Sequence, residues 1–227
     1  MRAEFNNRLI GILLCGSYAY GNPGPMSDID LFVIIDDNWR QKRVIYRENM
    51  EFELFINPPQ QIKKELTNGT DSTIDMFARG MILQDRDNRM QSLKELAIQL
   101  KTDGPTELSD EEVNFIRYIL SDALKDLQDC IGNDQIFRIQ YSTLLNILIQ
   151  EYQRLNRIWK KKPKDFLQYL KKHNEKEYLI FESLSSREAP EILYDRINRY
   201  ITNLLEPYGG PVIRCDWQTT PDVLKLD

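Results

Sequence analysis

The chain has 227 residues, of which 41% are hydrophobic and 29% charged, as is ordinary for a globular protein that buries a core. Its 30 basic and 35 acidic residues give a net charge of −5, and neither half is basic, since residues 1–103 hold 13 basic and 15 acidic side chains. This balance argues against a broad nucleic-acid interface, so we expect no nucleic acid as a partner.

Strands and helices alternate over about the first hundred residues. Apolar runs predict buried strands at 9–16 and 30–35, and a hairpin-like pattern around Glu48-Asn49 predicts strands at 43–47 and 50–56. Helices are predicted at 57–69, 71–80 and 89–100, with a short strand at 81–85. This order is typical of an α/β domain, with a mixed sheet flanked by helices.

The pattern changes after residue 103. Gly104 and Pro105 lie in a predicted linker at 101–112, where Ser109 and Glu112 form a capping box in front of an amphipathic helix. Only helices are predicted from there on, at 113–131, 135–159, 163–172, 177–186 and 190–208, with a short extended tail at 211–217. We therefore predict two domains, an α/β domain at 1–103 and an all-α helical domain at 104–227.

Several function classes find little support. Cys15, Cys130 and Cys215 are scattered, and His173 is the single histidine, so no zinc cluster follows from local spacing. His173 lies in a charged run, which disfavours a Ser-His-Asp hydrolase. The apolar run near the N-terminus is too short for a membrane span and has no cleavage site, so we expect a cytoplasmic protein without a membrane partner.

One segment carries a specific chemical pattern. Gly16 ends the first predicted strand and Ser17 follows it, and Asp28 and Asp30 stand at the start of the second. Side chains at positions i and i+2 of a strand point to the same face. The carboxylates of Asp28 and Asp30 could therefore share Mg²⁺, which prefers oxygen ligands. Gly16 lets the backbone approach phosphates, and Ser17 offers a hydroxyl and an amide at a helix N-terminus.

A third carboxylate is expected on a neighbouring strand. Glu53 and Glu51 share one face of the predicted strand at 50–56, and either could complete the site. Metal ions would neutralise a nucleoside triphosphate and help deprotonate an attacking hydroxyl. Glu53 could take the proton as a general base.

The segment GSYAYGNPGPMSDIDL, with Ser17 eleven residues before Asp28, resembles the pattern of the DNA polymerase β-like nucleotidyltransferase superfamily. The segment GPMSDID is similar to the corresponding segment of the antibiotic-modifying branch of this superfamily, which comprises the kanamycin and streptomycin/spectinomycin nucleotidyltransferases. ELFINPPQQI resembles the third-carboxylate strand of the streptomycin-modifying enzymes, which favours Glu53 over Glu51. The resemblance covers about residues 10–62.

The resemblance implies an Mg²⁺-dependent nucleotidyltransferase that moves a nucleoside monophosphate, AMP from ATP, to a hydroxyl of a small molecule such as an aminoglycoside. It implies catalytic and metal-binding roles for Asp28, Asp30 and Glu53. Nucleotide contacts are expected from Gly16, Ser17, Tyr18 and Ser27. The acceptor would lie in a cleft between the two domains, and a homodimer stays open because a second subunit completes the site in the kanamycin-modifying enzymes. Members of the superfamily usually have a full helix before the first strand, where this sequence has about eight residues.

Three alternatives remain. The acceptor could be a protein, as for antitoxin-like nucleotidyltransferases, although those are usually much shorter and the helical half lacks the R-x4-H pattern of the associated RNase family. The chain could also be a catalytically silent nucleotide-binding regulator. Polymerase or RNA-tailing activity is the weakest alternative, because an acidic chain offers no groove for a phosphate backbone. The basic run at 159–172 is interpreted as a solvated surface, with a role in the cleft as the alternative. Glu151 could be an acid that faces the cleft or a surface charge, and the sequence does not decide between them.

Overall fold

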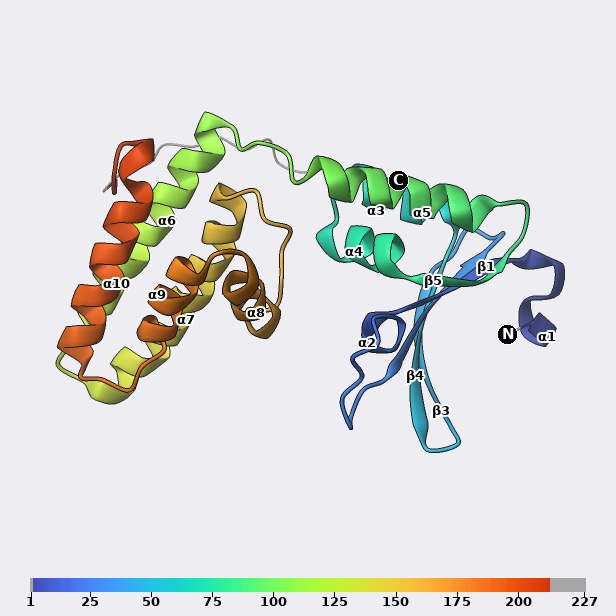
Figure 1. Cartoon of the computed structure of the whole chain (residues 1–227), viewed down its shortest axis with the longest axis horizontal. Coiled ribbons are helices and arrows are strands. Elements are labelled where there is room, and N and C mark those ends of the chain that lie inside the picture. Colours follow the sequence, from blue (N-terminus) through green and yellow to red (C-terminus); the bar gives the residue numbers. More distant parts are fainter. Residues whose placement is uncertain (1, 213–227) are drawn as a thin grey trace, which may run out of the picture. The chain divides into compact units, whose positions relative to one another are not determined.

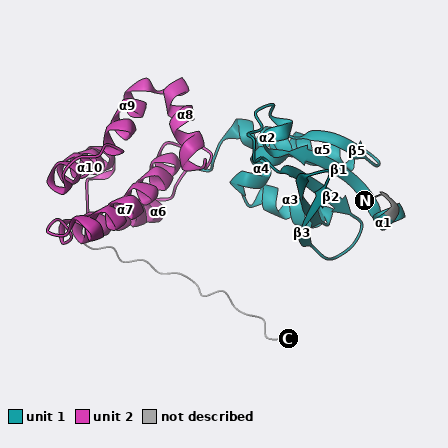
Figure 2. Ribbon diagram, turned by 90° about the horizontal axis from the view of Figure 1, so that it is seen from below, with its two compact units in different colours: residues 1–106 teal, residues 107–227 magenta. Residues whose placement is uncertain are grey.

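A computed structural model describes the backbone of residues 2–212 and the side chains from residue 4 onward. The chain divides into two compact units, residues 1–106 and 107–227, which are coloured separately in Figure 2. Each unit has its own secondary structure and its own core, so we describe them one after the other.

Unit 1 is built on a five-stranded mixed sheet (Figure 1). The strands are β1 (Leu9–Cys15), β2 (Ile29–Ile35), β3 (Gln41–Arg47), β4 (Met50–Asn57) and β5 (Met81–Asp85), in the order β3-β4-β2-β1-β5. Strands β2 and β4 pair in parallel and the other neighbours pair antiparallel. The sequence predicted this mixed sheet, and each predicted strand is present.

Strands β3 and β4 form the predicted hairpin. Glu48 and Asn49 connect them with φ angles of 50° and 62°. Positive φ at both central residues is the geometry of a two-residue turn that matches the twist of the flanking strands. The turn fixes the register, which pairs Arg47 with Met50 and Lys42 with Phe55.

Three helices pack together beside one face of the sheet: α3 (Pro59–Thr67), α4 (Asp71–Arg79) and α5 (Arg89–Asp103) (Figure 1). Phe77 of α4 lies edge-on against Phe32 of β2, with ring centroids 5.0 Å apart. Helix α5 approaches β1 so closely that a Cβ atom at Gly11 would lie 2.1 Å from Cγ of Met90. A glycine in this strand is therefore a packing requirement.

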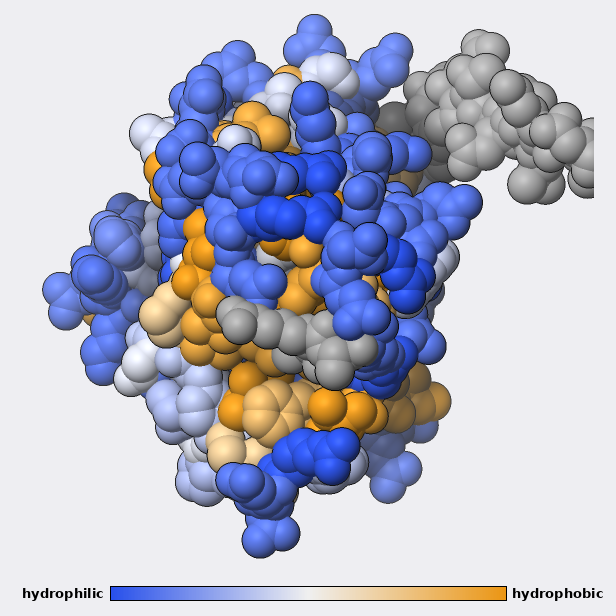
Figure 3. All heavy atoms as spheres, turned by 90° about the vertical axis from the view of Figure 1, so that its right-hand side faces the viewer, coloured by the Kyte–Doolittle hydropathy of each residue, from blue (hydrophilic) through white to orange (hydrophobic). Residues whose placement is uncertain are grey.

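The opposite face has a thinner cover. Helix α1 (Arg2–Phe5) and the 3₁₀ turn η1 (Asn6–Arg8) precede β1, and Phe5 packs near Trp39, with ring centroids 6.5 Å apart. Apolar side chains on this face join one core cluster, but Leu14, Ile29, Ile45 and Phe52 are only partly buried. Figure 3 shows apolar side chains gathered on the surface of unit 1.

Unit 2 is helical in its described part. Its helices are α6 (Asp110–Gln128), α7 (Asp134–Leu155), α8 (Pro163–His173), α9 (Glu175–Leu184) and α10 (Pro190–Leu205), followed by the 3₁₀ turn η2 (Glu206–Tyr208). The predicted capping box is confirmed: Ser109 Oγ accepts a hydrogen bond from the Glu112 amide, and the Glu112 carboxylate accepts one from the Ser109 amide. No helix in the described part of the chain combines the length and the apolar character needed to cross a membrane.

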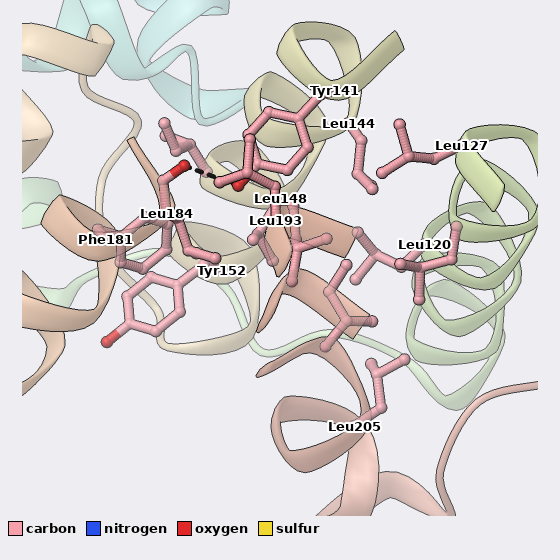
Figure 4. Close-up of a cluster of buried hydrophobic side chains, with 14 of the residues drawn as sticks. Leu120, Leu127, Tyr141, Leu144, Leu148, Tyr152, Phe181, Leu184, Leu193 and Leu205 are labelled. Atoms are coloured by element: carbon pink, nitrogen blue, oxygen red, sulfur yellow. Dashed lines mark hydrogen bonds between the residues drawn. The ribbon is translucent and has the colours of Figure 1, made fainter. Parts of the chain in front are cut away.

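The core of unit 2 is large and aromatic-rich (Figure 4). Phe166, Phe181 and Tyr152 meet edge-to-face, with ring centroids 5.1 to 5.6 Å apart. The Tyr141 hydroxyl donates a hydrogen bond of 2.7 Å to the Leu184 carbonyl, drawn as a dashed line in Figure 4. Aliphatic side chains from all five helices, α6 to α10, also belong to this core.

Some predicted bounds were wrong for local reasons. Helix α5 continues to Asp103, three residues into the predicted linker, because nothing stops it before Gly104, whose φ is +80°. Helix α7 ends at Leu155, before Arg157 takes a positive φ of 52°. Helix α10 ends at Leu205, since Pro207 cannot continue the hydrogen-bond ladder. The predicted tail at 211–217 lies almost wholly outside the described residues.

Candidate active site

Three carboxylates from two neighbouring strands converge in unit 1. Asp28 lies directly before β2, Asp30 is its second residue, and Glu53 lies in β4. One carboxylate oxygen from each residue lies within 4.8 Å of the other two, and all three residues are half-buried. Among the described residues, this is the only group of three side chains that could hold a metal ion in this way.

The strand pairing explains the convergence. In the parallel register of β2 and β4, Asp30 stands opposite Glu53, and the next pair on the same face is Phe32 with Phe55. The two phenylalanine rings stack with centroids 5.1 Å apart. The carboxylates therefore sit at the edge of an apolar floor. A hard divalent cation such as Mg²⁺ fits this donor set, since it prefers carboxylate oxygens.

Gly16 stands against this cluster. It begins the four-residue helix α2 (Gly16–Ala19) with a φ of +68°, and a Cβ atom there would lie 2.0 Å from Oδ2 of Asp30. From the sequence, we expected that the missing side chain of Gly16 lets the backbone approach phosphates. The structure adds that the missing side chain leaves room for the Asp30 carboxylate.

The other residues expected at the nucleotide lie on the same loop. Ser17 is half-buried and Tyr18 is 36% exposed. Ser27 closes the turn before Asp28, because its hydroxyl accepts a hydrogen bond of 2.8 Å from the Gly24 amide. Their roles at a nucleotide stay predictions. The loop between α2 and β2 and the β3–β4 hairpin project toward the same end of unit 1 (Figure 1).

Tyr20 packs against helix α4. The Arg79 guanidinium lies over the Tyr20 ring at 3.5 Å from the centroid. Burial and, to a lesser extent, the charge of Asp75 raise the pKa of the Tyr20 hydroxyl, which therefore stays protonated near neutral pH. Tyr20 thus anchors the loop to α4.

Glu51, the alternative third carboxylate, has a different partner. It faces Tyr46 across the hairpin and accepts a hydrogen bond of 2.5 Å from the Tyr46 hydroxyl. This hydrogen bond raises the pKa of Tyr46. Glu51 is not part of the cluster that Glu53 forms with Asp28 and Asp30.

Sequence reasoning missed Lys42 of β3. Its Nζ atom lies 2.5 Å from Oε1 of Glu53 and 5.4 Å from the centroid of the Phe55 ring. The hydrogen bond to Glu53 raises the pKa of Lys42, and the charges of Glu53, Asp30 and Asp28 act in the same direction. The hairpin could have revealed Lys42 in the sequence. A two-residue turn at Glu48-Asn49 places Lys42 opposite Phe55, two residues from Glu53.

Cys15 lies beneath the site and is chemically quiet. It is fully buried at the end of β1, and its thiol donates to the Asp30 carbonyl at 3.5 Å. Burial and the charges of Asp30 and Asp28 raise the pKa of Cys15 to about 12. A thiol with such a pKa holds its proton near neutral pH and is a poor nucleophile.

The candidates in unit 2 have structural partners. Glu151 is 8% exposed in α7 and forms an ion pair of 2.8 Å with Arg154, so the surface charge, one of the two roles that the sequence left open, does not apply. Its apolar surroundings explain its burial, because the nearby residues Leu148 and Tyr152 belong to the core. His173 ends α8 beside the Tyr169 ring, with ring centroids 4.5 Å apart.

Comparison with known proteins supports nucleotide transfer as the chemistry of unit 1. Residues 2–71 match a family model described as a nucleotidyltransferase domain. This segment runs from α1 into the start of α4 and contains Gly16, Ser17 and all three carboxylates. The match supports nucleotide transfer as the general class of reaction. No curated protein matches the chain.

The fold has a solved counterpart. The crystal structure of a nucleotidyltransferase-like protein from Exiguobacterium sibiricum 255-15 is similar, with a TM-score of 0.55. The two sequences are 14% identical, and the similarity covers 91% of this chain and 72% of the other. At this identity the likeness shows the fold alone: a nucleotidyltransferase fold followed by a helical region.

Proposed function

We propose that this chain transfers a nucleoside monophosphate, AMP from ATP, to a hydroxyl group of a small molecule and releases pyrophosphate. The observation that carries the proposal is the convergence of Asp28, Asp30 and Glu53 within 4.8 Å, directly beside the Gly16-Ser17 turn. The family match over residues 2–71 supports the same reaction class. Unit 1 would be the catalytic domain.

Asp28, Asp30 and Glu53 would hold Mg²⁺. When bound, the ion would neutralise charge on the triphosphate and favour the deprotonated form of the attacking hydroxyl. Gly16 keeps the Asp30 carboxylate in place by leaving its space free. The Ser17 hydroxyl would donate to a phosphate oxygen.

Glu53 would move the proton. The oxygen of the acceptor hydroxyl forms a bond to the α-phosphorus of ATP, and the bond from that phosphorus to the bridging oxygen breaks. Pyrophosphate leaves with the electron pair, and a Glu53 carboxylate oxygen accepts the hydroxyl proton. A carboxylate suits this task because it is ionised near neutral pH and acts as a general base only within hydrogen-bond reach.

The acceptor class rests on the resemblance to the antibiotic-modifying branch. GPMSDID and ELFINPPQQI are similar to segments of the kanamycin- and streptomycin-modifying enzymes, and the helical unit is consistent with their two-domain plan. We therefore propose an aminoglycoside-like hydroxyl compound as acceptor.

The test is transfer of label from α-³²P nucleotides to a panel of hydroxylated acceptors, with pyrophosphate release measured in parallel. Labelled small-molecule product that needs Mg²⁺ and Asp30 supports the proposal. Label that appears on protein instead indicates a protein acceptor. Nucleotide binding without transfer to any acceptor indicates a silent nucleotide-binding regulator.

A further inference from the structure

Lys42 and Glu53 form a close ion pair at the edge of the carboxylate cluster. The pair spans neighbouring strands, because Lys42 of β3 stands opposite Phe55, two residues beyond Glu53 in β4. Its Nζ–Oε1 distance is 2.5 Å, and the side chains are 56% and 18% exposed. Lys42 thus reaches from solvent toward a partly enclosed acid, with the Phe55 ring beside its ammonium group.

The surrounding charges favour a cation at this place. Asp28, Asp30 and Glu53 bring three like charges within 4.8 Å of one another, an arrangement that repels itself unless a cation lies nearby. The Lys42 ammonium supplies one such cation from the chain itself. The neighbouring acid on the hairpin, Glu51, has the neutral Tyr46 hydroxyl as its partner, so the ammonium is paired with the acid of the cluster.

We propose that Lys42 is an internal counter-ion of the carboxylate cluster that competes with the divalent metal for Glu53. It would hold the cluster together in the metal-free protein and weaken metal binding when no nucleotide is present. A divalent ion that takes Glu53 displaces the ammonium, which can swing away because its side chain is more than half exposed. This inference rests on the proposed function, since it assumes that the cluster binds a metal.

The test compares Mn²⁺ binding by wild type, Lys42→Gln, Lys42→Arg and Arg43→Gln, without nucleotide, by electron paramagnetic resonance of the free ion. Arg43 is a matched control, because it lies one residue away on the same strand, points to the other face and pairs with Glu4 at 2.7 Å. Lys42→Gln should bind Mn²⁺ about three- to tenfold more tightly, a modest change because the pair is partly exposed. Lys42→Arg and Arg43→Gln should stay within about twofold of wild type.

Thermal unfolding gives a second readout. In EDTA, Lys42→Gln should unfold at a lower temperature than wild type, and saturating Mn²⁺ should raise its midpoint more than it raises that of wild type. Unchanged or weaker Mn²⁺ binding by Lys42→Gln, in a protein that unfolds cooperatively, would overturn the inference. Weaker binding would mean that Lys42 positions Glu53 for the metal.

Asp30→Asn separates this inference from the proposed function. If Mn²⁺ binding depends on Asp30 but is indifferent to Lys42, the inference about Lys42 fails and the metal site stands. If Asp30→Asn, alone and combined with Lys42→Gln, still binds Mn²⁺ as tightly as the parent protein, the ion binds elsewhere. The proposed site then fails together with the inference. Absence of Mn²⁺ binding in every variant contradicts both.

Discussion

Gly16 and the Asp30 carboxylate occupy complementary space: a Cβ atom at Gly16 would lie 2.0 Å from Oδ2 of Asp30. The φ angle of +68° at Gly16 adds a second constraint, because residues with a side chain rarely adopt it. The glycine of the Gly-Ser turn is therefore coupled directly to a candidate metal ligand on the adjacent strand.

Gly16→Ala should displace the Asp30 carboxylate and weaken Mn²⁺ and nucleotide binding by at least about tenfold, with a stability loss on the order of 1 to 3 kcal/mol. Gly21→Ala is the matched control, since Gly21 has a similar φ of +73° but nothing lies within 4 Å of its Cβ position. Gly21→Ala should lose about as much stability through backbone strain, but it should bind Mn²⁺ and nucleotide as wild type does. Titrations and thermal unfolding of both variants check this, and equal binding losses would contradict the coupling.

Glu53→Gln should lower the rate of nucleotide transfer by roughly 10²- to 10⁴-fold, the range expected when a general base is removed. Glu51→Gln, two residues away on the same face, should change the rate by no more than about threefold, because Glu51 is held by Tyr46. Pyrophosphate release with an active acceptor measures both. The assignment fails if Glu51→Gln is the inactive variant.

The contrast between Glu53 and Glu51 shows what local sequence can predict. Alternation along the strand placed both acids on one face. The order of predicted strands and helices indicated the fold class, and the spacing of Gly16, Ser17, Asp28 and Asp30 indicated the first part of the candidate site. The choice between the two acids depends on the parallel register of β2 and β4, in which Asp30 faces Glu53. That pairing is non-local, so neither periodicity nor turn chemistry encodes it; only the family resemblance favoured Glu53.

Lys42 and Glu151 show what could not be predicted from the sequence. Lys42 was overlooked because a charged residue on an edge strand is normally a solvated one, and its meaning comes from a neighbouring strand. The sequence left open whether Glu151 is a surface charge or an acid facing the cleft; acids are rarely buried, but this one is buried with Arg154 as its partner at 2.8 Å. In both cases a specific partner overrides the average behaviour of the residue type.

Cys15 should resist alkylation in the folded protein at pH 8, because it is fully buried and its pKa is about 12. Cys130, which is partly exposed, should react faster than Cys15. Because folding raises the thiol pKa, the stabilisation by protonated Cys15 is complete below 9.0, the ordinary value, and is lost as the pH rises toward about 12. Mass spectrometry of iodoacetamide-treated protein checks the reactivity, and rapid labelling of Cys15 without denaturant would contradict its burial.

Ser109→Ala should destabilise unit 2 by about 1 kcal/mol, because it removes the side-chain cap of α6. The hydrogen bond from the Ser109 amide lowers the pKa of Glu112. The resulting stabilisation is therefore complete above 4.5, the ordinary glutamate value, and is lost as the pH falls through the lowered pKa. Denaturant unfolding of wild type and Ser109→Ala at pH 7 and pH 3 checks both effects, and an unchanged midpoint at pH 7 would contradict the role of the cap.

Calorimetric titration with ATP, with and without Mg²⁺, on wild type, Asp30→Asn and Asp36→Asn tests the central claim most directly. Asp36 is the control because it directly follows β2 at the end opposite Asp30 and pairs loosely with Arg86, at 3.8 Å. We predict Mg²⁺-dependent ATP binding that Asp30→Asn loses and Asp36→Asn keeps. ATP binding by Asp30→Asn that equals wild type would contradict a nucleotide site built on Asp28, Asp30 and Glu53.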